Sequence, residues 1–180
     1  METAELIEAI DVYRFHGVDR FFDIMPLLYN PEATRSVVKK LAETVPEEAT
    51  HIASMEARGF ILGPLVAQEL DLPFVAFRKP GKLPGEVAVS SAHDIEYRKG
   101  NQIEVQKGAL KPGDRVLILD DVAATCNTAG AAAELVESMG AEVAGFSFLI
   151  YLSSLRNLNS GFMDRWGDKV KYLIDDRDIP

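Results

Sequence analysis

The sequence predicts an α/β fold, a doubly wound and mainly parallel sheet with helices on both faces. Short apolar runs typical of strands alternate along the chain with helical patterns. One of these runs, Val116-Leu117-Ile118-Leu119, is entirely apolar, as expected for a strand covered on both faces. The length of 180 residues suits one domain with a sizeable core, and no linker or repeat divides residues 1–180.

Taken in order, the elements follow from local patterns. Residues 3–13 are expected to form a short helix, and residues 15–28 an apolar, irregular stretch ending near Pro26. Pro31 opens a helix through about Leu41, because residues 33, 37, 38 and 41 place apolar side chains on one face. Further helices are expected over 60–69 and 128–139, and Gly140 ends the second of them. A turn is expected at 112–113. Further strands are expected over 50–54, 74–77, 87–90, 103–106, 116–119, 143–152 and 170–174.

Charge and composition exclude several classes of partner. The formal net charge is -9 and the pI is about 4.8, so counterion release does not favour nucleic acid, and no long basic run favours an anionic membrane. Cys126 is the single cysteine, which rules out an intramolecular disulfide and fits a reducing compartment. The acidic N-terminus resembles no signal peptide, and no apolar run approaches roughly 20 residues. These observations predict a soluble, cytoplasmic protein.

The segment from Arg115 to Met139 carries the strongest functional signal. Asp120 and Asp121 end a buried strand, at the sheet edge where open α/β folds bind ligands. The loop after them opens a helix, whose free N–H groups and positive dipole end suit a phosphate. Thr125 and Thr128 add hydroxyl donors. Because carboxylates repel phosphate, the acidic pair suits sugar hydroxyls, directly or through a divalent ion, and the segment indicates a site for a ribose 5-phosphate.

Other interpretations of this segment remain open on spacing alone. The acidic pair could cap a turn, and Thr128 could be an ordinary helix N-cap. A Walker lysine and a G-x-G-x-x-G pattern are both absent from the sequence, so a P-loop or a Rossmann cofactor site is not supported. His16, His51 and His93 are scattered and are assigned to no metal.

The same segment resembles the signature for phosphoribosyl pyrophosphate (PRPP) of the type I phosphoribosyltransferases. In that family a hydrophobic strand ends in two acidic residues before a loop of the form A-T-G-G-T. Asp120 and Asp121 match the acidic pair, and Ala124, Thr125 and Thr128 match the loop, whereas Cys126 and Asn127 stand where the family usually has glycines. Two glycines let a backbone approach phosphate closely, so these replacements predict weaker PRPP binding. A helix N-terminus could also lower the pKa of the Cys126 thiol.

The resemblance covers about Gly17 to Leu155 and is closest to adenine phosphoribosyltransferases, because three other blocks match in order. Glu56-Ala57-Arg58-Gly59-Phe60 resembles the pyrophosphate loop, in which the first peptide bond is cis. Arg78-Lys79-Pro80-Gly81-Lys82-Leu83-Pro84-Gly85 resembles a basic block in a flexible hood, here residues 78–106, and Glu96 and Tyr97 match the L-E-Y motif of the same hood. Residues 14–30 correspond to the base-pocket segment, where Phe21 matches and Phe22 replaces an arginine, while Val122 replaces a leucine that packs on the base.

The resemblance implies transfer of a 5-phosphoribosyl group from PRPP to a purine, with adenine as the leading base, giving AMP and pyrophosphate. It assigns the leaving charge to Arg58, Arg78, Lys79 and Lys82, and the purine proton to Glu96, with Tyr97 closing the hood. Mg²⁺ is expected to arrive with PRPP near Asp120 and Asp121, without a metal site made by protein ligands alone. A homodimer is also implied, with the loop of Arg58 near the interface.

Three alternatives stay open at the sequence level. The first is a phosphoribosyltransferase for 6-oxopurines, which Phe22 and Val122 leave possible because they alter the base pocket. The second is a non-catalytic protein that senses PRPP or a nucleotide, which the Cys126-Asn127 pair favours. The retained acidic pair and the Glu96-Tyr97 hood argue against a sensor, since pure binding needs no hood. A scaffold with only an interaction role is the weakest alternative.

Overall fold

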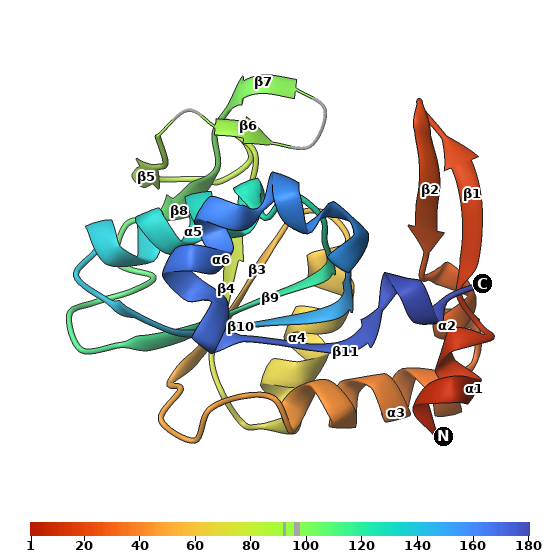
Figure 1. The fold of residues 1–180 in the computed structure, drawn as a ribbon. Helices are drawn as coiled ribbons and strands as arrows, with labels where there is room; N and C mark the ends of the chain where they lie inside the picture. The colour runs from red at the N-terminus through yellow and green to blue at the C-terminus, as the bar shows by residue number, and fades with distance from the viewer. Residues whose placement is uncertain (92, 96–97) are drawn as a thin grey trace.

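A five-stranded parallel sheet forms the centre of the computed structural model, which describes residues 1–91, 93–95 and 98–180 (Figure 1). Its strands are β3 (His51–Met55), β4 (Phe74–Phe77), β9 (Arg115–Ala123), β10 (Glu142–Tyr151) and β11 (Val170–Asp175), in the spatial order β4-β3-β9-β10-β11. All neighbours are parallel, so the predicted sheet is confirmed. The winding direction reverses between β3 and β9, and doubly wound sheets bind ligands at that point.

Two layers of helices cover the sheet. On one face lie α3 (Pro31–Ala42) and α4 (Gly59–Glu69), and on the other lie α5 (Asn127–Ser138) and α6 (Ser160–Trp166). The start of α3 follows from local chemistry, because the side chain of Asn30 accepts hydrogen bonds from the backbone N–H groups of Glu32 and Ala33. The four apolar residues predicted on one face of α3 are all buried. Both faces of the sheet are therefore covered, as the apolar run in β9 predicted.

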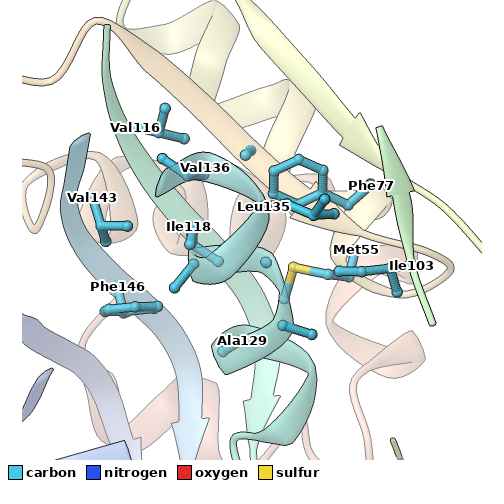
Figure 2. Packing of buried hydrophobic residues seen from close by; sticks show 14 of the residues in the cluster. Met55, Phe77, Ile103, Val116, Ile118, Ala129, Leu135, Val136, Val143 and Phe146 are labelled. Atoms are coloured by element: carbon cyan, nitrogen blue, oxygen red, sulfur yellow. The ribbon is translucent and has the colours of Figure 1, made fainter. Parts of the chain in front are cut away.

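The core on the α5 side shows why that helix is rich in alanine. Ile118 of β9 and Phe146 of β10 lie against Leu135 and Val136 of α5 (Figure 2). The small side chains at residues 129 and 131–133 are also buried, so the helix packs close to the strands. This close packing holds the first turn of α5 next to the carboxyl end of β9, where the predicted site begins.

The N-terminal predictions need correction. The first helix, α1 (Thr3–Ile7), ends well before residue 13. The stretch predicted to be irregular is instead an antiparallel hairpin of β1 (Asp11–Phe15) and β2 (Val18–Asp23), followed by the short helix α2 (Met25–Tyr29). His16 and Gly17 form its tight turn with positive φ values of 48° and 83°. The hairpin stands apart from the main sheet, and among the described residues its two strands pair only with each other. Apolar and polar residues therefore alternate only weakly along these strands, so the sequence gives little sign of them.

A second excursion separates β4 from β9. It contains β5 (Val87–Val89) paired with β8 (Glu104–Gln106), and β6 (His93–Ile95) paired with β7 (Arg98–Asn101), all antiparallel and outside the main sheet. The strands expected at 87–90 and 103–106 are thus confirmed, whereas β6, β7, α6 and the short 3₁₀ segments were not predicted. These segments are η1 (Ser153–Leu158), η2 (Gly167–Lys169) and η3 (Asp176–Asp178). Within the part of the chain described, no helix has the length and apolar character needed to cross a membrane.

Candidate active site

A cleft of about 930 Å³ opens at the carboxyl ends of β3 and β9. Three segments form its walls: the β1–β2 hairpin between Phe15 and Phe22, the loop from β3 into α4, and the loop from β9 into α5. Residues from η1 and η3 complete the lining. The volume lies within the range of roughly 300–1,000 Å³ typical of sites for small molecules. The reversal of the sheet therefore coincides with an opening large enough for a small ligand.

The acidic pair lies in this cleft as predicted. Asp121 is 4% exposed, and its Oδ2 lies 2.8 Å from Nε of Arg58. Oδ1 of Asp120 accepts a hydrogen bond of 2.9 Å from the backbone N–H of Asp121. Burial and the neighbouring charge of Asp121 raise the pKa of Asp120 well above its usual value. Burial also raises the pKa of Asp121, although the positive charge of Arg58 acts in the opposite direction.

Arg58 connects three walls of the cleft. Besides its ion pair with Asp121, its guanidinium donates a 3.1 Å hydrogen bond to the carbonyl oxygen of Phe22 and lies 4.7 Å from the ring centroid of Phe21. A third of its side chain (32%) remains exposed. The arginine thus holds the acidic pair and the hairpin in fixed positions, while part of its charge still faces the cleft.

The loop from β3 into α4 has the geometry that the resemblance implied. The peptide bond between Glu56 and Ala57 is cis, and both residues line the cleft. A carboxylate oxygen of Glu56 accepts a 2.7 Å hydrogen bond from Nε of Arg78. Behind this loop, a Cβ added at Gly59 would lie 2.7 Å from Oδ1 of Asp120, so only glycine lets the start of α4 approach the acidic pair this closely.

The basic block divides into two groups. Lys79 lines the cleft, as expected for a group that binds an anion. Among the described residues, Arg78 and Lys82 lie outside the lining, because Arg78 pairs with Glu56 and also donates to the carbonyl oxygen of Lys82. The other predicted residues of this excursion, Glu96 and Tyr97, fall outside the described residues.

The loop from β9 into α5 brings Ala124, Thr125, Cys126, Asn127 and Thr128 to the cleft. Cys126 adopts a left-handed conformation, with φ 59° and ψ 11°, which glycine adopts more readily than any other residue. Its side chain is buried in the core, and burial raises the pKa of the thiol to about 12. The expectation of a lowered pKa is therefore wrong, since desolvation outweighs the helix terminus.

Asn159 secures this loop from outside it and was missed by the sequence reasoning. The residue is 2% exposed, and its Nδ2 donates a 2.9 Å hydrogen bond to the carbonyl oxygen of Ala124. Its Oδ1 accepts a longer bond, 3.4 Å, from the hydroxyl of Tyr151. Nearby, the backbone N–H of Leu152 donates to the carbonyl oxygen of Ala123. No local pattern could reveal Asn159, because its partner lies 35 residues earlier in the chain.

The hairpin presents the predicted base-pocket residues. Phe22 is 3% exposed and packs in the core behind α3 and α4, although it also reaches the cleft. The guanidinium of Arg20 lies 5.3 Å from its ring centroid and likewise lines the cleft. Replacement of the family's arginine by Phe22 therefore leaves two other cations, Arg20 and Arg58, beside the hairpin. Val122 faces the same cleft from β9.

Comparisons with known proteins agree with this geometry. Residues 27–165 match the family described as phosphoribosyl transferase domain. The adenine phosphoribosyltransferase of Carboxydothermus hydrogenoformans is 48% identical over 155 residues, covering 86% of this chain and 88% of that protein. The crystal structure of the enzyme from Thermoanaerobacter pseudethanolicus superposes with a TM-score of 0.88 at 34% identity, covering 97% and 99% of the two chains.

A further solved structure contains ligands. The adenine phosphoribosyltransferase of Trypanosoma brucei, in complex with AMP, pyrophosphate and ribose-5-phosphate, has a TM-score of 0.86 at 26% identity, covering 99% of this chain and 81% of that one. Together with the acidic pair and the loop at the start of α5, these similarities show that the chain belongs to the phosphoribosyl transferase family and, within it, to the adenine phosphoribosyltransferases.

Proposed function

We propose that the cleft between β3, β9 and the hairpin holds PRPP and adenine together and transfers the 5-phosphoribosyl group to N9 of the base, giving AMP and pyrophosphate in purine salvage. The observation that carries this proposal is the meeting of three chemically different groups at one sheet reversal. These groups are the acidic pair on β9, the N-terminus of α5, and the Glu56–Arg58 loop. The enzymatic activity agrees with that of the relatives named above.

The ribose and its 5′-phosphate are assigned to the β9–α5 segment. Residues 124–128 lie at the start of a helix of 12 residues, so backbone N–H groups and the positive dipole end face the phosphate, and Thr125 and Thr128 add hydroxyls. Asp120 and Asp121 accept hydrogen bonds from the ribose hydroxyls. Their negative charge also stabilises the positive charge that develops at C1′ as its bond to pyrophosphate breaks.

The pyrophosphate is assigned to the loop from β3 into α4 and to the basic block after β4. Arg58 and Lys79 face the cleft with positive charge, next to Glu56 and Ala57. Arg78 and Lys82 belong to the hood over residues 78–106, and the proposal places them near the leaving group only when the hood closes over it. In the reaction N9 of adenine forms a bond to C1′, pyrophosphate leaves with the electron pair of the broken bond, and the N9 proton leaves the base.

The purine is assigned to the space between the hairpin and β9. Phe21 and Phe22 offer aromatic surface, and Val122 offers an apolar contact from the sheet. Glu96 takes part in moving the purine proton, and Tyr97 helps to exclude water, which would otherwise hydrolyse the reactive sugar centre. Both of these roles come from the family resemblance.

Mg²⁺ is the proposed cofactor, and the donor set fits it. The cleft offers two carboxylates close together, Asp120 and Asp121, which suit a hard cation. Among the described residues no group of three or more metal-binding side chains occurs, so the remaining ligands would come from PRPP and water. When bound, the ion neutralises charge on the departing pyrophosphate. Asp120 and Asp121 would then hold the metal-bound substrate in place rather than build a separate metal site.

Three further assignments complete the proposal. The 180 residues act as one domain, with residues 78–106 as its hood and residues 14–30 as its base-pocket segment. The active form is a homodimer, which a sedimentation experiment tests directly. The compartment is the cytoplasm, and the single, buried Cys126 is compatible with reducing conditions there.

The deciding experiment follows pyrophosphate release with PRPP, Mg²⁺ and one purine at a time. We expect turnover with adenine, and an Asp121→Asn variant should lose at least about 100-fold in kcat/KM, because an oriented charge in a buried site is worth several kcal/mol. The exposed Asp168→Asn serves as a matched control and should behave like the wild type. Turnover with hypoxanthine but not adenine would overturn the substrate, and binding of PRPP without turnover of any purine would favour a sensor.

A further inference from the structure

Two arginines join the hairpin that bounds the purine space to the rest of the molecule. Among the described residues, the strands β1 and β2 pair only with each other. Nη1 of Arg58 donates to the carbonyl oxygen of Phe22. Nη2 of Arg20, which belongs to β2 itself, donates a 2.7 Å hydrogen bond to the carbonyl oxygen of Ile179 and a longer one, 3.4 Å, to the main-chain oxygen of Pro180. The scheme above uses Arg58 but gives Arg20 no role.

The segment that accepts the bonds from Arg20 is anchored in the fold. The side chain of Ile179 is 3% exposed and belongs to the core cluster that also contains Phe22. Just before it, Asp176 of η3 accepts bonds of 2.5 and 3.2 Å from the hydroxyl and the backbone N–H of Ser154 in η1. Figure 1 shows this C-terminal stretch beside the foot of the hairpin. Arg20 therefore ties β2 to a segment that is itself held by the core and by η1.

The two arginines act on opposite faces of β2. Successive side chains of a strand point to opposite faces, so Arg20 and Phe22 share one face and Phe21 lies on the other. The guanidinium of Arg20 lies 5.3 Å from the ring centroid of Phe22. The guanidinium of Arg58 lies 4.7 Å from the ring centroid of Phe21. Cations attract aromatic rings at such distances, so each face of the strand is held by one positive charge.

Two points of attachment fix the orientation of a strand, whereas a single point allows the strand to pivot. Arg58 binds β2 at residue 22, and Arg20 binds it from two residues earlier, about 7 Å along the strand. The purine is assigned to the space between the hairpin and Val122. A pivot of β2 would therefore change the width of the space into which the planar base must fit.

We propose that Arg20 is a positioning residue for the purine site, which fastens β2 to the segment around Ile179 and so fixes the aromatic wall of Phe21 and Phe22 relative to Val122. This inference rests on the proposed function and deepens it. Phe22 stands where the family usually has an arginine, and Arg20 provides a positive charge on the same face of β2.

The two arginines differ in what else they hold, which makes the role of Arg20 separable. Arg58 pairs with Asp121 as well as with the hairpin, so its loss should affect both substrates. Arg20 binds the hairpin to the segment after β11, so its loss should affect the purine more than PRPP. A residue that served only general stability would change neither KM well below the melting temperature.

The test measures KM for each substrate at a saturating concentration of the other. Arg20→Met keeps a side chain of similar reach but removes the charge and the donors. It should raise KM for adenine about tenfold, the effect of losing one hydrogen bond from a charged group, and leave KM for PRPP within about twofold. Arg20→Lys retains a charge and a donor, so it should recover part of the loss. Arg35→Met is the control, because Arg35 is an exposed arginine of α3 and, among the described residues, lies outside the cleft lining.

An unchanged KM for adenine in Arg20→Met would overturn the inference, as would an equal rise of both KM values or no recovery in Arg20→Lys. Because Arg20 is exposed, neither variant removes a core side chain.

Hydrogen exchange of the free protein separates the inference from the proposed function. In Arg20→Met the amides of β1 and β2 should exchange at least about fivefold faster, while those of β9 stay unchanged. Unchanged exchange in the hairpin would refute the fastening by Arg20 whatever the activity. If the wild type releases no pyrophosphate with any purine, the proposed function fails, and the exchange rates still decide whether Arg20 fixes the hairpin.

Discussion

Replacing Asn159 by alanine tests whether a buried amide outside the signature loop determines its geometry. The substitution removes the donor to the carbonyl oxygen of Ala124 (2.9 Å) and the acceptor for the hydroxyl of Tyr151 (3.4 Å). A buried polar group left without a partner costs about 1–3 kcal/mol, and the longer Tyr151 bond contributes the smaller share. We therefore expect a loss of about 2–3 kcal/mol of stability. In a domain of this size that loss lowers Tm by roughly 4–12 °C.

The functional effect should appear in one kinetic constant more than in the other. Since Ala124 begins the loop assigned to the 5′-phosphate, KM for PRPP should rise at least about fivefold, as for one lost hydrogen bond, while KM for adenine changes little. Differential scanning calorimetry and initial rates of pyrophosphate release measure the two effects. Asn157→Ala is the matched control, because Asn157 is an exposed asparagine in the same segment. A Tm within 1 °C of the wild type together with an unchanged KM for PRPP would refute the reasoning.

Three other predictions follow from the same region. Because its pKa is about 12, the thiol of Cys126 in the folded protein should react with a disulfide reagent at pH 8 about 1,000-fold more slowly than a thiol with an ordinary pKa. Unfolding should remove this protection, and a fast reaction of the folded protein would contradict the burial of the thiol. The double variant Cys126→Gly/Asn127→Gly should lower KM for PRPP, because glycine adopts the left-handed conformation at position 126 freely; an unchanged KM would reject the idea that these replacements weaken binding. Gly59→Ala should lose about 1–3 kcal/mol of stability and much of kcat, because the new Cβ would lie 2.7 Å from Oδ1 of Asp120. Gly161→Ala is the control, because a Cβ there would meet nothing within 4 Å. Equal melting curves and rates for the two variants would contradict this prediction.

The pH dependence of stability offers a check on the acidic pair. The folded-state pKa of Asp120 is raised, so its protonated form favours the folded protein. That contribution is fully present below the unfolded pKa, near 3.8, and is lost as the pH rises through the higher folded pKa. Asp120→Asn removes the buried charge, so it should raise Tm at neutral pH while lowering activity. A lower Tm at neutral pH would show that other contacts of Asp120 outweigh its desolvation.

The sequence by itself determined the order of the central elements and the location of the main chemistry. The apolar run before Asp120, the proline at the start of α3 and the glycine after α5 all act through near neighbours, so they can be recognised locally. The signature blocks carried the family, because their residue types and spacing match known motifs. The left-handed conformation of Cys126 and its raised pKa lay beyond this kind of reasoning, since both depend on what packs around the loop.

Only the tertiary structure decided how these segments cooperate. The hairpin of β1 and β2, mistaken for a helix and an irregular stretch, forms a wall of the cleft because Arg58 donates to the carbonyl oxygen of Phe22, 36 residues earlier in the chain, and contacts the ring of Phe21. Asn159 acquires its role from a partner 35 residues distant in the chain. Burial, hydrogen bonding and desolvation depend on all groups brought together in space, whereas periodicity and capping depend on a few neighbours along the chain. The signature in β9 could therefore be recognised in the sequence, but the residues that hold and complete the cleft could not.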